Sequence, residues 1–137
     1  MFTTHQTNPN LIEARVGGKI TSIEMGTGID ALAAMARDME DGSILMIYDD
    51  FDMPEAGAIV EELKRLPQLF EMISHVSKIA ILSDQAWVRK AAEFEGMIIP
   101  GVTIRGYPIA ERAQAEAFLS GEQLVDDDND FGDNMPV

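Results

Sequence analysis

Residues 43–52 read SILMIYDDFD, a continuous apolar run that leads into three aspartates within four positions. A run of this kind without polar alternation predicts a strand at the centre of a sheet, covered on both faces. Residues 78–83, KIAILS, repeat the pattern and are followed by Asp84. Buried strands separated by a stretch with helical periodicity are typical of a parallel sheet. We therefore expect an α/β fold.

The segments around these two strands continue the alternation. Residues 11–16 and 19–25, joined by the pair Gly17-Gly18, predict an antiparallel hairpin, and residues 101–105 predict a short last strand. Apolar residues recur at helical spacing in four segments, which are 29–39, 54–66, 84–95 and 108–119. The expected order is ββαβαβαβα. It gives a single, mostly parallel central sheet with an N-terminal antiparallel hairpin and four helices.

Two of the predicted helices carry apolar stripes that we expect to pack against the sheet. The stripes consist of Ile59, Leu63 and Leu66 in one helix and of Trp87, Val88, Ala91 and Phe94 in the next. Asp52 and Asp84 are expected to cap the starts of these helices. Residues 26–28, Gly-Thr-Gly, are expected to precede the first helix, and they lack the third glycine or the lysine of a nucleotide-binding loop.

The chain of 137 residues predicts one domain. We place it at residues 10–120, after a flexible lead-in over residues 1–9. Residues 121–137 hold six carboxylates and no lysine or arginine. Such a segment has too little apolar surface to offset the entropy of ordering, so we expect a disordered acidic tail.

Composition excludes several classes of protein. The chain has no cysteine, and 24 acidic residues against 10 basic ones give a net charge of −14. Disulfides and thiolate sites are therefore excluded, and nucleic acid and anionic membrane surfaces are not expected as partners. The sequence shows neither a membrane-spanning run nor a signal peptide, which favours the cytoplasm.

The element order, together with particular fragments, resembles the STAS fold of anti-sigma-factor antagonists. It is more closely similar to the SpoIIAA-like family of small bacterial proteins. The fragments are residues 13–25, residues 44–52 (ILMIYDDFD), residues 78–87 (KIAILSDQAW) and residues 108–119, and the resemblance covers residues 10–120. It implies a domain of five strands and four helices that acts by binding and has no established catalytic residues or cofactor.

The sequence departs from the antagonists at the start of the second helix. Antagonists carry a phosphorylated serine there, whereas residues 52–57 read DMPEAG and no Ser or Thr lies between Asp49 and Leu66. We therefore expect no phosphorylation switch of that kind. Glu55 either presents a permanent negative charge in its place or serves as a first-turn residue that favours the helix dipole.

The candidate binding site follows the first central strand. Ligands of open α/β sheets bind at the carboxyl ends of the strands, and this position is occupied by Asp50, Phe51, Asp52, Met53, Pro54 and Glu55. Phe51 and Met53 are either packed under the second helix or exposed for a partner. We expect a protein partner or a small apolar ligand, no enzymatic activity, and a homodimer held by apolar helix surface.

An alternative hypothesis comes from receiver domains, in which strand-end acidic residues hold magnesium and accept a phosphoryl group. Asp49 and Asp50 would form the acidic pair and Asp84 the acceptor. A receiver also needs a lysine at the end of a later strand, where this chain has Arg105, and it begins directly with the acidic strand. We therefore expect no metal site and keep the receiver as the second hypothesis.

Overall fold

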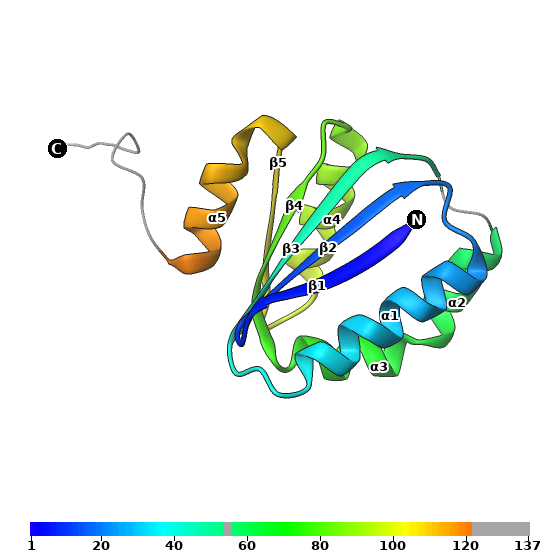
Figure 1. The fold of residues 1–137 in the computed structure, drawn as a ribbon, viewed down its shortest axis with the longest axis horizontal. Coiled ribbons are helices and arrows are strands. Elements are labelled where there is room, and N and C mark those ends of the chain that lie inside the picture. Colours follow the sequence, from blue (N-terminus) through cyan, green and yellow to red (C-terminus); the bar gives the residue numbers. More distant parts are fainter. Residues whose placement is uncertain (54–55, 122–137) are drawn as a thin grey trace, which may run out of the picture.

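The computed structural model describes residues 1–53 and 56–121. One five-stranded sheet, in the order β1-β2-β3-β4-β5, forms the centre of the protein (Figure 1). The strands are β1 (Phe2–Asn8), β2 (Leu11–Gly18), β3 (Gly42–Phe51), β4 (Val76–Leu82) and β5 (Thr103–Tyr107). β1 runs antiparallel to β2, and the other neighbours are parallel. The predicted α/β class with a mostly parallel sheet is confirmed.

Within the described ranges, five α-helices and one short 3-10 helix connect and cover the strands. They are α1 (Ser22–Ala36), α2 (Ala56–Lys64), α3 (Leu66–Ile73), α4 (Ala86–Ile98), η1 (Ile109–Glu111) and α5 (Arg112–Ser120). α5 lies on one side of the sheet, and α1, α2 and α3 lie on the other (Figure 1). None of the helices in the described ranges is long and apolar enough to cross a membrane.

The pleat of β3 divides the core between the two faces of the sheet. Leu45 and Ile47 pack with Ala115 and Leu119 of α5. Ile44 points to the opposite face, into the cluster that includes residues of α1 and α3. Because both faces are covered, β3 must be apolar at successive positions, which is why its sequence shows no alternation.

The hairpin lies earlier in the chain than predicted. β1 and β2 pair from Phe2 opposite Val16 to Asn8 opposite Leu11, so the chain turns at residues 9–10. The hairpin predicted over residues 11–25 is therefore wrong in position. The flexible lead-in predicted over residues 1–9 is also wrong, because most of this segment forms β1. β1 escaped prediction because only Phe2 in this strand is apolar enough to signal burial.

α1 begins within the segment that was predicted as a strand. Thr21 is its N-cap and forms a capping box with Glu24, in which each side chain bonds the backbone N–H of the other residue. The bond from the Thr21 backbone is the main reason why the pKa of Glu24 is lowered. The Thr-x-x-Glu spacing was the sequence signal for this start, and residues 26–28 consequently lie inside the helix.

The two glycines of residues 26–28 allow close packing on α1. A Cβ added at Gly28 would lie 2.5 Å from two ring atoms of Phe2, and one added at Gly26 would lie 2.9 Å from a guanidinium nitrogen of Arg65. Gly26 and Gly28 are both buried. These glycines therefore serve the contact of α1 with β1 and with the end of α2, and they do not form a loop around a phosphate.

α2 and α3 replace the single second helix of the prediction. α2 ends at Lys64, and α3 begins at Leu66 with Pro67 in its first turn. Proline is tolerated there because the first helical N–H groups have no partner within the helix. Pro67 thus ends one helix and starts the next, which explains the additional helix.

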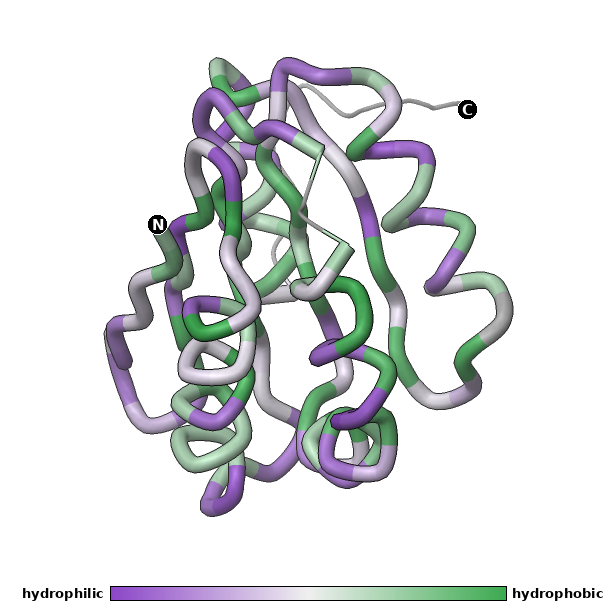
Figure 2. The backbone as a smooth tube through the Cα atoms, turned by 90° about the vertical axis from the view of Figure 1, so that its right-hand side faces the viewer, coloured by the Kyte–Doolittle hydropathy of each residue, from purple (hydrophilic) through white to green (hydrophobic). Residues whose placement is uncertain are grey.

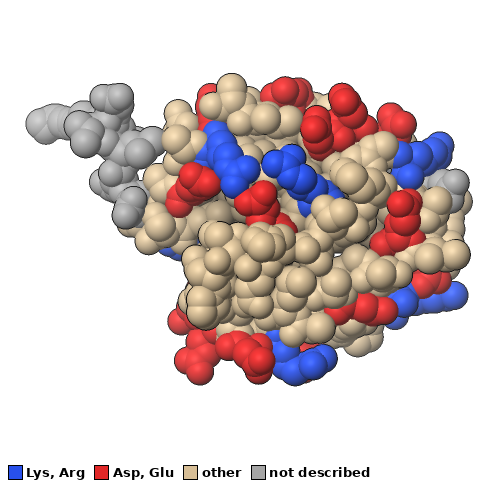
Figure 3. All heavy atoms as spheres, viewed as in Figure 1, with Lys and Arg blue, Asp and Glu red and all other residues tan. Residues whose placement is uncertain are grey.

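α5 is tied to the sheet by an ion-pair network. Arg112 Nη2 lies 2.7 Å from Glu13 of β2, and Arg112 Nε lies 2.9 Å from Glu116. Arg15 lies 4.0 Å from the same Glu13. On the face shown in Figure 3, the cations accordingly lie close to acidic side chains. The positive charges of this region are thus used to hold α5 in place.

Candidate functional site

The predicted site residues at the end of β3 divide into exposed and buried ones. Asp50, Asp52 and Met53 are exposed, Met53 to 61%. Phe51 is only 7% exposed and belongs to the core. Pro54 and Glu55 lie outside the described residues. The side chains presented to a partner at this position are therefore the carboxylates and Met53, without Phe51.

A β-bulge at Asp50 causes this division. Gly17 pairs with Asp49 and Gly18 pairs with Phe51, so Asp50 is the extra residue between them. Its φ of 50° is in the left-handed region. A bulge shifts the side-chain alternation by one position, so Phe51 comes to lie on the same face of the sheet as Tyr48. The sequence pattern alone gave no sign of this insertion.

Three aromatic rings connect the end of β3 to the start of α4. Tyr48 and Phe51 meet edge to face with ring centroids 5.0 Å apart, and the Phe51 and Trp87 centroids are 6.0 Å apart. Gln85, the N-cap residue of α4, donates from Nε2 to the Phe51 carbonyl at 2.8 Å. The end of β3 and the first turn of α4 are therefore held in one fixed arrangement.

Asp84 does not cap α4, contrary to the prediction. Its Oδ1 accepts a hydrogen bond from the Ile109 N–H at 3.0 Å and so holds the start of η1. The described part of the chain contains no group of three or more His, Asp or Glu side chains that could hold a metal ion. The geometry gives the receiver hypothesis with Asp49, Asp50 and Asp84 no support.

The apolar stripes of α2 and α4 are exposed, which corrects the prediction that they are buried. Ile59 and Leu63 of α2 are 42% and 59% exposed, and Trp87 and Phe94 of α4 are 44% and 61% exposed. Leu66 is exposed as well. Val88 of α4 is the single buried side chain among the seven in the two predicted stripes. The two helices contact the rest of the protein through other sides.

The stripe of α2 lies on the side that is turned away from α1. The opposite side packs on α1, where a Cβ added at Gly57 would lie 3.4 Å from the Ser22 Cβ. Ile59 and Leu63 are four residues apart and so share one side of the helix. α2 lies between α1 on the left and α4 on the right in Figure 2, so a side turned away from α1 is turned toward α4.

The stripe of α4 lies on the side nearest to the middle of the sheet. The opposite side packs on β5, where a Cβ added at Gly96 would lie 2.9 Å from the Ile104 Cβ. Trp87 points toward Phe51 of β3. Phe94 follows seven residues later, two helical turns along, and therefore lies on the same side as Trp87.

Two glutamates lie near Tyr48, one from each of these helices. Burial is the main reason why the pKa of Tyr48 is raised, and the charges of Glu62 on α2 and Glu95 on α4 raise it further. Burial also raises the pKa of both carboxyls, and Glu62 adds to the effect on Glu95. Both side chains remain exposed to solvent. Because the charge of Glu62 contributes to the raised pKa of Glu95, the two carboxyls lie close to each other, at a position that is partly shielded from solvent.

These features together define what we call the α2–α4 surface. It consists of the apolar side chains Ile59, Leu63, Trp87 and Phe94 together with Glu62, Glu95 and Tyr48. It adjoins the predicted site through the contact of Trp87 with Phe51. Sequence reasoning identified the apolar side chains but assigned them to the core, because an amphipathic stripe looks the same whether or not a partner in the chain covers it.

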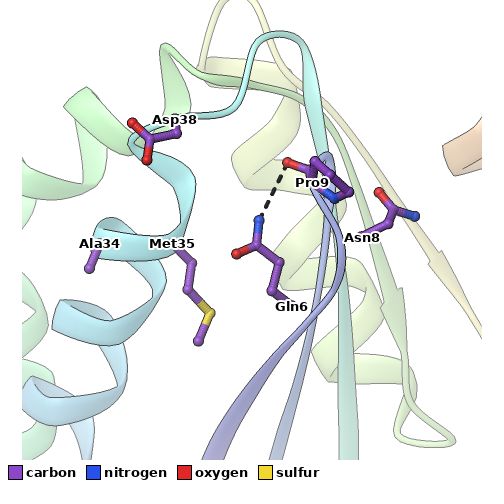
Figure 4. A pocket seen from close by; sticks show the side chains of 6 residues that line it. All are labelled: Gln6, Asn8, Pro9, Ala34, Met35 and Asp38. Carbon is purple, nitrogen blue, oxygen red and sulfur yellow. Dashed lines mark hydrogen bonds between the residues drawn. The ribbon is translucent and has the colours of Figure 1, made fainter.

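A separate hollow of about 520 Å³ lies between the hairpin and α1 (Figure 4). Gln6 of β1 and Met35 of α1 extend into the space, and Asp38 lies at its rim. Gln6 donates to the Pro9 carbonyl at 3.4 Å. The hollow combines one carboxylate with amides and a thioether, and none of these groups is a nucleophile or base with an activating partner.

Comparisons with known proteins agree with this architecture. The SpoIIAA-like family model matches residues 11–120. A search of curated proteins gives no match. An uncharacterized protein of the DUF3478 family with a SpoIIAA-like fold, from Shewanella loihica PV-4, is 14% identical with a TM-score of 0.67, covering 87% of this chain and 92% of that one.

A second similar structure is the Bacillus cell fate determinant SpoIIAA in the phosphorylated form. It is 14% identical with a TM-score of 0.53, and the match covers 83% of this chain and 97% of that one. At this level of identity both structures show the fold alone.

Proposed function

The chain belongs to the SpoIIAA-like family, and from this premise we propose that it is a non-catalytic binding module of the bacterial cytosol. The module binds an apolar part of a protein partner or a small apolar ligand. The contact is made by the α2–α4 surface, and the exposed residues Asp50, Asp52 and Met53 lie beside it at the end of β3.

The observation that carries this proposal is the exposure of large apolar side chains on facing sides of α2 and α4. Nine of the eleven large apolar side chains that are exposed in the described ranges lie on α2, α3, α4 or the loop before α2. Scattered exposed apolar residues are ordinary, but a concentration of them on neighbouring elements supports a binding surface. No activated nucleophile accompanies this group, so binding without chemistry is the simplest use of it.

We also propose that the module is not switched by phosphorylation at the start of α2. The similar SpoIIAA structure is of the phosphorylated form. In this chain no hydroxyl side chain lies between Asp49 and Leu66. Regulation of binding would therefore depend on the abundance of the partner or on another modification.

The proposal is tested with N-phenyl-1-naphthylamine, a neutral apolar dye that fluoresces when it leaves water. Trp87 is the only tryptophan, so energy transfer from it reports dye bound nearby. Replacing both Leu63 and Phe94 by Ser should weaken binding about thirty-fold, since each truncation removes roughly 1 kcal/mol of apolar contact and about 1.4 kcal/mol corresponds to a factor of ten in affinity.

The matched control is Ile23→Ser on α1, because Ile23 is 79% exposed and lies outside the α2–α4 surface. This variant should bind the dye as the unmodified protein does. The proposal is wrong if the unmodified protein shows no energy transfer, or if the double variant binds the dye with unchanged affinity.

A further inference from the structure

We propose that the α2–α4 surface binds a basic amphipathic helix of a partner protein. The inference rests on the proposed function and adds the chemistry of the occupant, which must bring apolar side chains on one face and lysine or arginine beside them. The shape of the surface, its charge and the pairing of the nearby cations support this occupant.

The shape of the surface suits a helix. α2 has 9 residues and α4 has 13, which corresponds to lengths of about 13 and 20 Å. The apolar side chains of α2 and α4 lie on facing sides, and the sheet residue Tyr48 lies close to a glutamate from each helix. Two helices that present apolar side chains toward a common strip form the arrangement in which a third amphipathic helix is commonly bound.

The charge of the surface selects the sign of the partner. Glu62 and Glu95 belong to the surface itself, and Asp49, Asp50 and Asp52 are exposed at the adjoining end of β3. A carboxylate ligand such as a fatty acid would add negative charge here. A lysine or arginine next to Glu62 and Glu95 would instead offset the cost of enclosing these carboxylates, which already raises their pKa.

The cations of the flanking helices do not neutralise this charge. Lys64 lies 3.6 Å from Glu61, which also pairs with Arg65. Arg89 donates to the Ser83 carbonyl at 2.6 Å on the β5 side of α4. Lys90 is the remaining cation on α2 and α4 within the described ranges. Within the described ranges none of the five carboxylates forms an ion pair, so a partner with positive charge can supply one.

The test compares two synthetic peptides of about 14 residues, roughly four helical turns. One contains leucine and lysine at amphipathic spacing, and the other has glutamate in place of each lysine. Neither peptide contains tryptophan, so a change in the emission of Trp87 reports binding to the full chain. Calorimetry then measures the affinity of each peptide. The lysine peptide should bind at least about ten-fold more tightly, and added salt should reduce the difference.

Variants separate the charge of this surface from the net charge of the protein. Glu62→Gln with Glu95→Gln should weaken binding of the lysine peptide about ten-fold and leave the neutral dye bound as before. Asp38→Asn with Glu40→Gln removes the same number of charges near the end of α1 and should change affinity for the peptide less than about two-fold.

The possible outcomes distinguish a failure of this inference from a failure of the proposed function on which it rests. If the neutral dye binds but the two peptides bind equally, the basic partner is refuted and the proposed function stands. If the unmodified protein does not bind the dye, the proposed function itself is wrong. A dimer that buries Trp87 and excludes the lysine peptide would show that a second copy occupies the surface, and would also refute the inference.

Discussion

Gly28 of α1 offers a quantitative test of the contact between the first strand and the first helix. A Cβ added there would lie 2.5–2.6 Å from three ring atoms of Phe2, where nonbonded carbon atoms require about 3.5–4.0 Å. The ring would have to move by about 1 Å. Overpacking of this kind costs about 1–3 kcal/mol, whereas Ala in place of Gly inside a helix gains about 1 kcal/mol.

The two terms are separated by a double-mutant cycle with Phe2→Ala. In the presence of Phe2, Gly28→Ala should lower the free energy of unfolding by up to about 2 kcal/mol. In the Phe2→Ala background the clash is absent, so the same substitution should raise it by about 1 kcal/mol. Urea unfolding followed by circular dichroism measures all four proteins, and the expected coupling is about 1–3 kcal/mol.

Gly57→Ala is the control for this cycle, because its added Cβ would lie at an ordinary distance of 3.4 Å from Ser22. It should not couple to Phe2→Ala. Equal effects of Gly28→Ala in both backgrounds would refute the reasoning. They would also reopen the possibility that residues 26–28 are free to approach a ligand.

Two further predictions concern the residues at and near the binding surface. Asp50 and Asp41 both have a φ of 50°, so Asp50→Gly and Asp41→Gly should each alter the free energy of unfolding by less than about 1 kcal/mol in chemical denaturation. Only Asp50→Gly should weaken binding of the lysine peptide. An equal loss of affinity in both variants would count against a role for the site. The raised pKa of Glu95 disfavours its charged form in the folded state. Glu95→Gln should therefore raise the denaturant midpoint of unfolding at pH 7 relative to the unmodified protein. This difference should disappear as the pH falls below the ordinary pKa of a glutamate carboxyl, where both side chains are neutral. A difference in midpoint that does not change with pH would contradict the prediction.

The central part of the fold was predictable because burial on both faces leaves a strong signal. β3 and β4 are apolar at successive positions, and few other structures require this pattern. β1 was not predictable in the same way, since only Phe2 contacts the core while the rest of the strand is polar. Pro67 was ambiguous for a different reason, because a proline ends one helix and suits the first turn of another.

The candidate site at the end of β3 stays a prediction, and the structure changes which of its side chains are open to solvent. The position after β3 follows from the general rule for open α/β sheets. The orientation of Phe51 depends on the bulge at Asp50, and a single inserted residue reverses which side chain is buried. No periodicity in the sequence specifies such an insertion, since it is fixed by the pairing with β2.

The error over Ile59, Leu63, Trp87 and Phe94 supports the proposed function. Helical spacing shows that one side of a helix is apolar, but it does not show what covers that side. α2 uses its opposite side to pack on α1, and α4 uses its opposite side to pack on β5. An apolar stripe that no other element of the described fold covers is the feature expected of a helix that makes a contact outside the fold. The carboxylates of Glu62 and Glu95 then favour a basic partner wherever the contact is large enough to cover both helices, because a helix without positive charge would enclose these carboxylates uncompensated.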